Sequence, residues 1–344
     1  MTQKEPPSAI VLHSCLSDAY GGFKYFRKRL KLTAWSYVNF ASTGRWMSHW
    51  NSSPFLMLLA RSTPCVLQKV YRPYLTNRLR CSDRVDVLVG HYAFIIKKAL
   101  GPIVLRAAES PVLLGELSGK SNDVYQLHLA AVDVLESEGE LILRLSKGGI
   151  LLYSVAFTFI THLEVTSVMI GCLQGPRGAD ALDRVRKATR DLFGLRPKNL
   201  LVRLVHQIAH KFDCQDLILV SNENRVLSRQ TRKGLVFADY DATWEEIGAV
   251  RGQDGDFRLS CKTMPAPDID AIPSKKRSEA KKRFALVDHA VGLIWAALRR
   301  PQFSLAPGAT AAANQIGKFV EEDFTWPTAD REPHISESVT VMIS

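Results

Sequence analysis

Two hydrophobic periods alternate along the chain and divide it into helical and strand segments. Between residues 21 and 114 the apolar residues mostly recur at helical spacing, as they do over 85–100. From Tyr125 to Leu173 the period is two, so that Tyr125, Leu127 and Leu129 alternate with small or polar residues. The expected strands cover 125–131, 141–146, 150–160 and 165–173. The short links between them predict an antiparallel meander.

Helical spacing returns after residue 180. One helix is expected over 182–192, closed by Gly194, and another begins at Pro197. The apolar segment 216–220 predicts a short buried strand, and 274–300 predicts a long helix. A strand–helix–strand passage attached to a meander predicts one parallel pair in a mixed, mostly antiparallel sheet. The expected fold class is therefore α/β (α+β), with a helical N-terminal region.

Charge and composition divide the chain further. The net charge of +11 is unevenly distributed. Residues 1–115 contain 16 Lys+Arg and 5 Asp+Glu, whereas residues 301–344 contain 2 Lys+Arg and 6 Asp+Glu. A basic surface favours an anionic partner. The parts we expect are a flexible leader (1–20), a helical basic region (21–114), an α/β domain (115–300) and an acidic, partly ordered tail (301–344).

The cysteines and the apolar segments argue against a metal-binding, disulfide-bonded or membrane-spanning protein. The six cysteines form no C-x-x-C pair, and His206 and His210 have no acidic partner nearby, so we expect no metal site and no disulfides. No secretory signal precedes the first helix. The most apolar stretch, Ile150–Ile160, is about half as long as a spanning helix needs. We therefore expect a soluble, cytoplasmic protein.

Eight short segments stand out for their order and spacing along the chain. They are 71–74 (YRPY), 91–92 (HY), 170–176 (IGCLQGP), 193–198 (FGLRPK), 220–222 (VSN), 238–241 (ADYD), 244–246 (WEE) and 272–277 (IPSKKR). Together they resemble the VirK/YbjX family of Gram-negative bacterial proteins, over about residues 25 to 295. The resemblance implies an association with virulence and with resistance to cationic antimicrobial peptides, and it supplies no catalytic residues.

The order of elements also resembles the GCN5-related acyltransferase (GNAT) fold. In that fold a glycine-bearing turn after the fourth strand opens a helix, and its backbone N–H groups hold the pyrophosphate of coenzyme A. The corresponding turn here contains Gln174, Gly175, Arg177 and Gly178. Arg177 stands where the first glycine of the usual pattern would be, and an extra helix precedes the expected one. An acyl carrier protein or an aminoacyl donor would depend less on this turn than acyl-coenzyme A.

Further candidate residues lie near this turn and after the last strand. Arg196 and Lys198 flank a helix start and are candidates for phosphate binding. Asp239 and Tyr240 offer a general base and a phenolic acid, and His91 is a third candidate for proton transfer. Asn222, Asp241 and Glu245 are candidates to line a cleft, and Asp241 is equally suited to cap a helix.

Two hypotheses follow. The first is a GNAT-like acyltransferase that moves an acyl or aminoacyl group from a thioester or ester donor to an amine or hydroxyl, on a peptide or an envelope component. It would have no tightly bound cofactor; acyl-coenzyme A, acyl carrier protein or an aminoacyl donor would serve as co-substrate. The second is a non-enzymatic VirK-like virulence or envelope-stress accessory protein that binds RNA or an acidic protein. Under either hypothesis the basic surface favours an anionic partner, which could be acyl carrier protein, coenzyme A, tRNA or other RNA, or lipid headgroups. Neither hypothesis predicts an oligomeric state.

Overall fold

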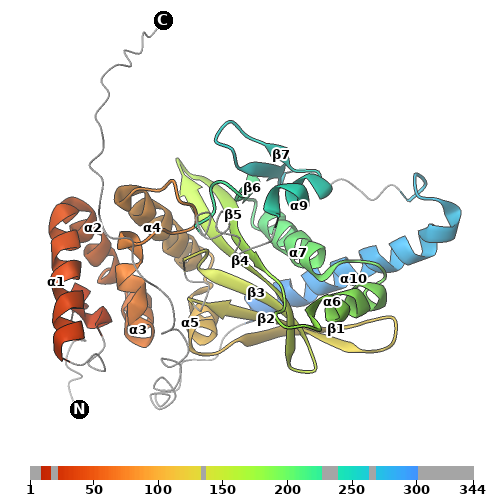
Figure 1. Ribbon diagram of the computed structural model, residues 1–344, viewed down its shortest axis with the longest axis horizontal. Helices are drawn as coiled ribbons and strands as arrows, with labels where there is room; N and C mark the ends of the chain where they lie inside the picture. Colours follow the sequence, from red (N-terminus) through yellow and green to blue (C-terminus); the bar gives the residue numbers. More distant parts are fainter. Residues whose placement is uncertain (1–8, 17–21, 133–136, 227–238, 263–268, 301–344) are drawn as a thin grey trace, which may run out of the picture. The chain divides into compact units, whose positions relative to one another are not determined.

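The computed structural model describes residues 9–16, 22–132, 137–226, 239–262 and 269–300 (Figure 1). All of them belong to one compact unit, Met1–Phe303. The predicted tail (301–344) lies outside the described residues. The N-terminal part is helical, and its elements are η1 (Leu12–Cys15), α1 (Gly22–Val38), α2 (Phe40–Trp50), α3 (Pro54–Ser62), η2 (Pro64–Tyr71), α4 (Cys81–Lys97) and α5 (Gly101–Glu109).

One sheet of eight strands follows in the described chain, in the order β1-β2-β3-β4-β5-β6-β8-β7. Every neighbouring pair is antiparallel except β5 and β6. The strands are β1 (Val112–Ser118), β2 (Val124–Ala131), β3 (Leu141–Lys147), β4 (Ile150–His162), β5 (Val165–Gln174), β6 (Asp216–Leu219), β7 (Val250–Arg251) and β8 (Phe257–Ser260). The helices among them are α6 (Ala181–Asp191), α7 (Pro197–Lys211), α9 (Tyr240–Glu246) and α10 (Ser274–Arg299).

The predicted fold class is confirmed, with a mixed, mostly antiparallel sheet in which β5 and β6 are parallel. The four meander strands and the parallel strand lie where the alternation placed them. Strand β1 was not predicted, because its burial follows no clear alternation. Strands β7 and β8 were also missed, since two and four residues are too few to show a period. Part of the predicted leader is structured, with Ile10 and Leu12 buried in the core.

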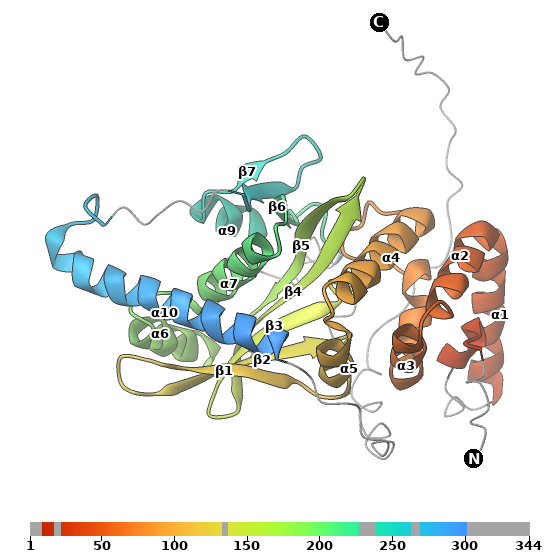
Figure 2. The ribbon, with the colours of Figure 1, turned by 180° about the vertical axis from the view of Figure 1, so that it is seen from behind.

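The main core lies between the sheet and the helices on one of its faces (Figure 2). Phe159 of β4 stacks on Phe94 of α4 with ring centroids 4.0 Å apart, and it also contacts Phe212, which follows α7. Phe212 in turn contacts Trp295 of α10. Aromatic side chains bury much apolar surface, and these four join three helices to one strand. On the other face a small separate cluster consists of Ala130, Ile142, Ala156 and Cys172.

The helical region is held to the sheet by a buried ion pair. Lys69 of η2 donates to Glu140, just before β3, at 2.7 Å, and both side chains are almost fully buried. Tyr92 of α4 donates to the other carboxylate oxygen of Glu140. Burial by itself raises the pKa of Glu140, but Lys69, His91 and these hydrogen bonds outweigh it, so the pKa lies below its usual range. Glu140 therefore stays ionised, and Lys69 lies within ion-pair distance of its buried carboxylate.

Strand β5 carries a β-bulge at Gly171. Ala156 and Phe157 of β4 face Cys172 and Ile170 of β5, so Gly171 is the extra residue. The pairing of β5 with β6 ends at Ile170, apart from one bond from the N–H of Val220 to the carbonyl of Ile170. A bulge bends its strand and ends regular pairing. Beyond Gly171 the last residues of β5 therefore leave the parallel pair.

We predict that Gly171→Ala destabilises the fold by about 1–3 kcal/mol, the cost of overpacking. A Cβ at residue 171 would overlap with the backbone carbonyl of Glu138, which cannot move aside as a flexible side chain does. The matched control is Gly292→Ala on the exposed face of α10, where a Cβ meets nothing. This control should gain up to about 1 kcal/mol in helix propensity. Urea unfolding measures both, and equal stabilities would contradict the packing described here.

Candidate functional site

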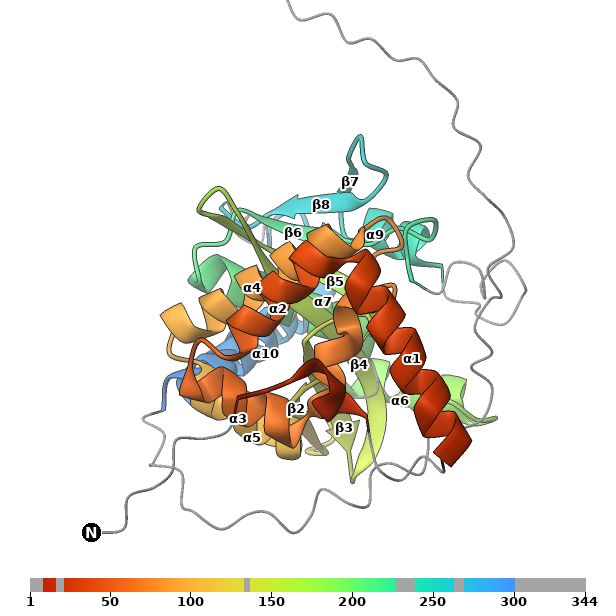
Figure 3. The same cartoon turned by 90° about the vertical axis from the view of Figure 1, so that its left-hand side faces the viewer.

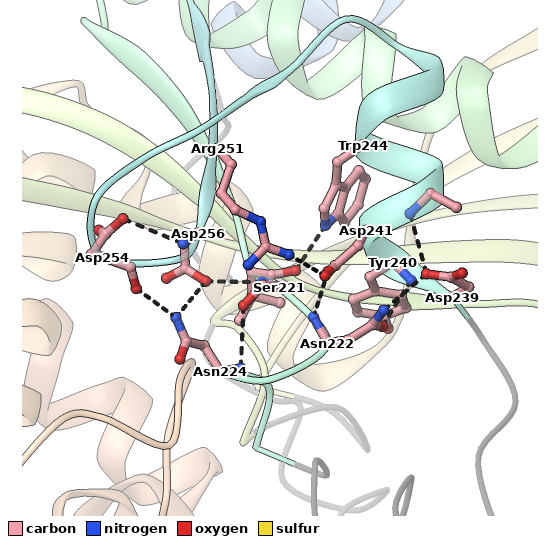
Figure 4. Close-up of polar contacts among 12 residues, drawn as sticks. Ser221, Asn222, Asn224, Asp239, Tyr240, Asp241, Trp244, Arg251, Asp254 and Asp256 are labelled. Carbon is pink, nitrogen blue, oxygen red and sulfur yellow. Dashed lines mark hydrogen bonds and ion pairs between the residues drawn. The ribbon is translucent and has the colours of Figure 1, made fainter.

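The candidate site lies where β5 and β6 end, under α9 (Figure 4). It combines the loop after β6, the first turn of α9 and the turn between β7 and β8. Segments 170–176, 220–222 and 239–246, which carried the family resemblance, meet here. The carboxyl ends of parallel strands are common places for ligands in sheets with helical crossovers.

Asn222 ties the loop after β6 to the start of α9. Its backbone N–H donates to Asp241 at 2.7 Å, its side-chain amide donates to Asp239 at 2.8 Å, and its side-chain oxygen accepts from the N–H of Tyr240. Asp239 also accepts from the N–H of Ala242 and so caps α9. The capping role expected for Asp241 is therefore wrong. Asp241 lies in the first turn and pairs with Arg251 instead.

Asp239 is an exposed, ionised carboxylate. The amide of Asn222 and the N–H of Ala242 hold the pKa of Asp239 below its usual range. Asp256 on the neighbouring turn is different, because burial raises its pKa. Asp256 accepts from the N–H of Ser221 at 2.9 Å and from the side chain of Asn224 at 3.0 Å. These bonds fix the shape of the loop after β6.

Tyr240 fills the space that β5 opens when it leaves β6. Its side chain is 2% exposed, and its hydroxyl accepts from the N–H of Leu173 at 2.8 Å and donates to the carbonyl of Leu173 at 3.0 Å. A tyrosine hydroxyl thus replaces the strand that would otherwise pair there. The sulfur of Cys172 is 3.6 Å from the same hydroxyl. Burial, with Cys172 and Glu138 nearby, raises the pKa of Tyr240 well above its usual value, so the phenol is neutral.

A buried polar cluster lies beneath Tyr240. The guanidinium of Arg225 is 4.1 Å from the centre of the Tyr240 ring. Glu138 is buried, and this burial raises its pKa, although Cys172 and Arg225 act in the opposite direction. Burial and Glu138 raise the pKa of the Cys172 thiol well above its usual value. Cys172 is therefore a protonated thiol and not a ready nucleophile.

The glycine turn after β5 is exposed and has an unusual backbone. Gly178 has φ +106°, a conformation that side chains with a Cβ rarely adopt, and Gly175 packs against the ring of Tyr153. The backbone N–H groups of residues 177–180 donate no hydrogen bond to any of the described residues. Arg184 of α6 donates to the carbonyl of Arg177 at 2.8 Å and so orders the turn. Gln174, at the end of β5, pairs with Ser154 of β4.

The structure does not bring all the predicted residues together. Arg196 makes two hydrogen bonds to Glu246 of α9, at 2.9 and 3.0 Å, and Lys198 donates to Thr243. The two cations therefore hold α9 on α7 and are already engaged by a carboxylate. Glu245 is exposed on α9.

His91 lies in a different place. Its Nδ1 accepts from the N–H of Phe159, which faces Val168 on β5, five residues before Leu173. At about 3.3 Å per residue, His91 is roughly 16 Å from the Tyr240 contact. The side chain is fully buried in the main core. His91 is thus part of the core and outside the candidate site.

Sequence reasoning missed Glu138, Arg225 and the role of Gly171. Glu138 and Arg225 stand alone in loops, where a charged residue gives no sign of burial. The close approach of Gly171 to Glu138 joins β5 to the loop before β3, which is distant from it in sequence. Within the described ranges, no group of three or more His, Cys, Asp or Glu side chains is placed to hold a metal ion.

A cavity of about 270 Å³ opens at the other end of β5. Its lining includes the cations Lys97, Lys98 and Lys262 and the acids Glu164 and Asp213. The ammonium group of Lys98 lies 5.9 Å from the ring centres of both Phe94 and Phe212. This cavity contains none of the predicted site residues.

The structure is that of an α/β protein with a mixed sheet, and the candidate site lies at the one parallel strand pair within the described chain. The family described as "Protein of unknown function (DUF535)" matches residues 21–294, and the chain belongs to it. The resemblance to the VirK/YbjX proteins is confirmed. The "Uncharacterized protein YbjX" of Escherichia coli is 29% identical over 70% of this chain and 74% of its own length.

Other similar proteins are more distant. An "Uncharacterized protein" of Haemophilus influenzae is 24% identical over 79% of this chain and 88% of its own length. Among solved structures, a cAMP-binding acyltransferase from Mycobacterium smegmatis aligns over 60% of this chain and 61% of its own, with 10% identity and a TM-score of 0.25. That likeness is too weak to support an argument on function.

A search of the described helices for membrane spans found no single helix with the length and apolar composition to cross a bilayer. Helices α4 and α5 meet these criteria only as a pair, bent by 117° at the break between them.

We predict that the protein loses stability as the pH falls from about 6.5 to about 4. Burial lowers the pKa of His91 and of His49 to about 4, whereas an unfolded histidine titrates near 6.5. The unfolded state therefore binds more protons in this window, and acid lowers the free energy of unfolding. For the fully buried His91 the loss is on the order of 3 kcal/mol.

The variant His91→Asn isolates this contribution, because an asparagine oxygen can still accept from the N–H of Phe159. Urea unfolding across the window should show a shallower fall for the variant than for the natural protein. If the free energy of unfolding falls equally with pH in the two proteins, the pKa of His91 is not lowered by its burial.

Proposed function

We propose that this protein is a GNAT-like acyltransferase that moves an acyl group from a thioester donor to an amine or hydroxyl acceptor. The observation that carries the proposal is the departure of β5 from β6 at the Gly171 bulge. Beyond this point no described strand pairs with β5 on the β6 side, and β5 runs on into the exposed glycine turn. Bulges occur preferentially next to active sites, and ligands of such sheets bind at the ends of parallel strands.

The glycine turn supplies the proposed donor site. Four successive backbone N–H groups, of residues 177–180, precede the first turn of α6 and have no hydrogen-bond partner among the described residues. Such groups bind phosphate where they point into a common concavity. Helix N-termini favour anions for the same reason. Coenzyme A and the phosphopantetheine arm of an acyl carrier protein both contain a phosphate at one end of the pantetheine chain and a thiol at the other. Either donor matches the chemistry of this turn.

Tyr240 is the proposed general acid. The acceptor nitrogen attacks the carbonyl carbon of the thioester, a C–N bond forms, and the C–S bond breaks. The leaving thiolate takes the phenolic proton, and the proton released by the amine passes through Asp239 or solvent to restore the phenol. Because its pKa is raised, Tyr240 is protonated at neutral pH, as a proton donor must be. Since Tyr240 is 2% exposed, the acyl end of the donor has to enter between β5 and α9.

The other candidates receive smaller roles. Asp239 is ionised and exposed beside Tyr240, but its lowered pKa makes it a weak base. Arg196 and Lys198 hold α9 through Glu246 and Thr243, so in this proposal they keep Tyr240 in place rather than bind the donor. His91 lies outside the site and takes no part in the reaction.

Donor binding tests the first half of the proposal. Native mass spectrometry of the full chain with acyl-coenzyme A species and with acyl carrier protein should show saturable binding to at least one of these donors. Gly178→Ala should weaken that binding at least tenfold, because a Cβ disfavours φ +106°. The control is Gly148→Ala, which removes another glycine with positive φ from the β3–β4 hairpin. Retention of RNA in place of any thioester would overturn the proposal.

Loss of the phenol tests the second half. Tyr240→Phe should lower the rate of thiol release in the presence of an amine acceptor by about 10²–10⁴-fold, the range for general acid–base catalysis. The control is Tyr125→Phe, which removes a buried tyrosine hydroxyl that donates to Asp191 at 2.8 Å, away from the site. Equal rates for the natural protein and Tyr240→Phe, with donor binding intact, would remove Tyr240 from the mechanism.

A further inference from the structure

Helix α1 exposes an unusual amount of apolar surface. The side chains of Phe23, Phe26, Leu30 and Tyr37 are 78%, 62%, 60% and 82% exposed. The helix lies at the surface of the helical region, beside α2 (Figure 3). Scattered exposed apolar residues are normal in a soluble protein, but a contiguous set indicates an interaction surface.

The exposed residues form one stripe. Positions 23, 26, 30, 34 and 37 follow one another at steps of three or four, so they share one face of the helix. The opposite face is the one that packs on the protein. Leu32 is buried there, and Tyr25 and Ser36 are half-buried. The stripe thus points away from the fold. Phe23, Phe26 and Leu30 therefore do not contribute to the core.

Cations flank the stripe. Lys24, Arg27 and Lys31 lie along one side of it by helical spacing, and Arg29 lies on the other. The segment 22–38 contains five Lys or Arg residues, Lys28 among them, and no Asp or Glu. An exposed apolar stripe bordered by cations is a feature of helices that lie in a membrane interface.

We propose that α1 binds the surface of an anionic phospholipid membrane, with its apolar stripe in the boundary between headgroups and acyl chains. The flanking cations then contact lipid phosphates. Charge decides against a second copy of the chain as the occupant, because two such helices would place like charges together. Nucleic acid would neutralise the cations but would leave Phe23, Phe26 and Leu30 in water. This inference is independent of the acyltransferase proposal.

Vesicle co-sedimentation of the full chain tests the inference. The protein should bind vesicles of phosphatidylcholine mixed with phosphatidylglycerol, and should bind those of phosphatidylcholine alone much more weakly. Added salt should weaken the binding, because it screens exposed charges. Lys24→Gln/Arg27→Gln should lower the affinity about thirtyfold at low ionic strength, since each cation near an anionic surface contributes about fivefold.

A matched pair of variants distinguishes binding through the stripe from non-specific binding through other exposed apolar residues. Phe26→Gln/Leu30→Gln removes two stripe residues and should lower the affinity at least tenfold. Leu163→Gln/Leu182→Gln removes two residues that are 84% and 72% exposed elsewhere, and should bind as the natural protein does. All four positions are exposed, so circular dichroism melting curves should coincide.

Three outcomes would overturn the inference. The first is the absence of binding to anionic vesicles. The second is an equal loss of binding in the two apolar variants. The third is a concentration-dependent dimer, seen by light scattering, that Phe26→Gln/Leu30→Gln abolishes while vesicle binding is unchanged, since this would assign the stripe to a second copy of the chain.

Discussion

The close approach of the Gly171 backbone to the carbonyl of Glu138 is the contact on which the candidate site depends. Without a Cβ, residue 171 can bulge out of β5, and the strand then leaves its parallel partner after Ile170. The space beside Leu173 is taken by the hydroxyl of Tyr240, which replaces both hydrogen bonds of a neighbouring strand. The bulge therefore positions the glycine turn, Tyr240 and the start of α9 together.

Buried polar groups connect this site to the helical region. Lys69, Glu140 and Tyr92 form one charged cluster, and Glu138, two residues before Glu140, belongs to the cluster beneath Tyr240. The N–H of Leu75 donates to the carbonyl of Ser137, so the segment after η2 runs along the same loop. Removing one member of such a pair leaves a buried charge uncompensated. The helical region and the sheet are thus one structural unit, although their sequences differ in period.

Periodicity predicted the elements but not the contacts between them. The four meander strands were correct because each has at least seven residues, enough to show a pattern. Strand β6 has only four residues and was recognised by its run of apolar residues. The sequence suggests Asp241 as the cap of α9, whereas the structure shows that Asp239 is the cap. Local sequence alone does not determine which of the two carboxylates accepts from the N–H groups of the first turn. The stripe of α1 resembled a core face, because the pattern alone does not tell whether an apolar side faces protein or solvent. His91 and Tyr240 both belong to family-like motifs, and only the register of β4 and β5 separates them.

The central claim is that a thioester donor binds at the carboxyl end of β5. Hydrogen exchange of the full chain, with and without a saturating acyl thioester, tests it most directly. The account predicts slower exchange of the backbone N–H groups of residues 177–180 and of Leu173 when the donor is bound. Donor binding that protects instead the cavity at Lys97 and Lys98, with the glycine turn unchanged, would contradict it.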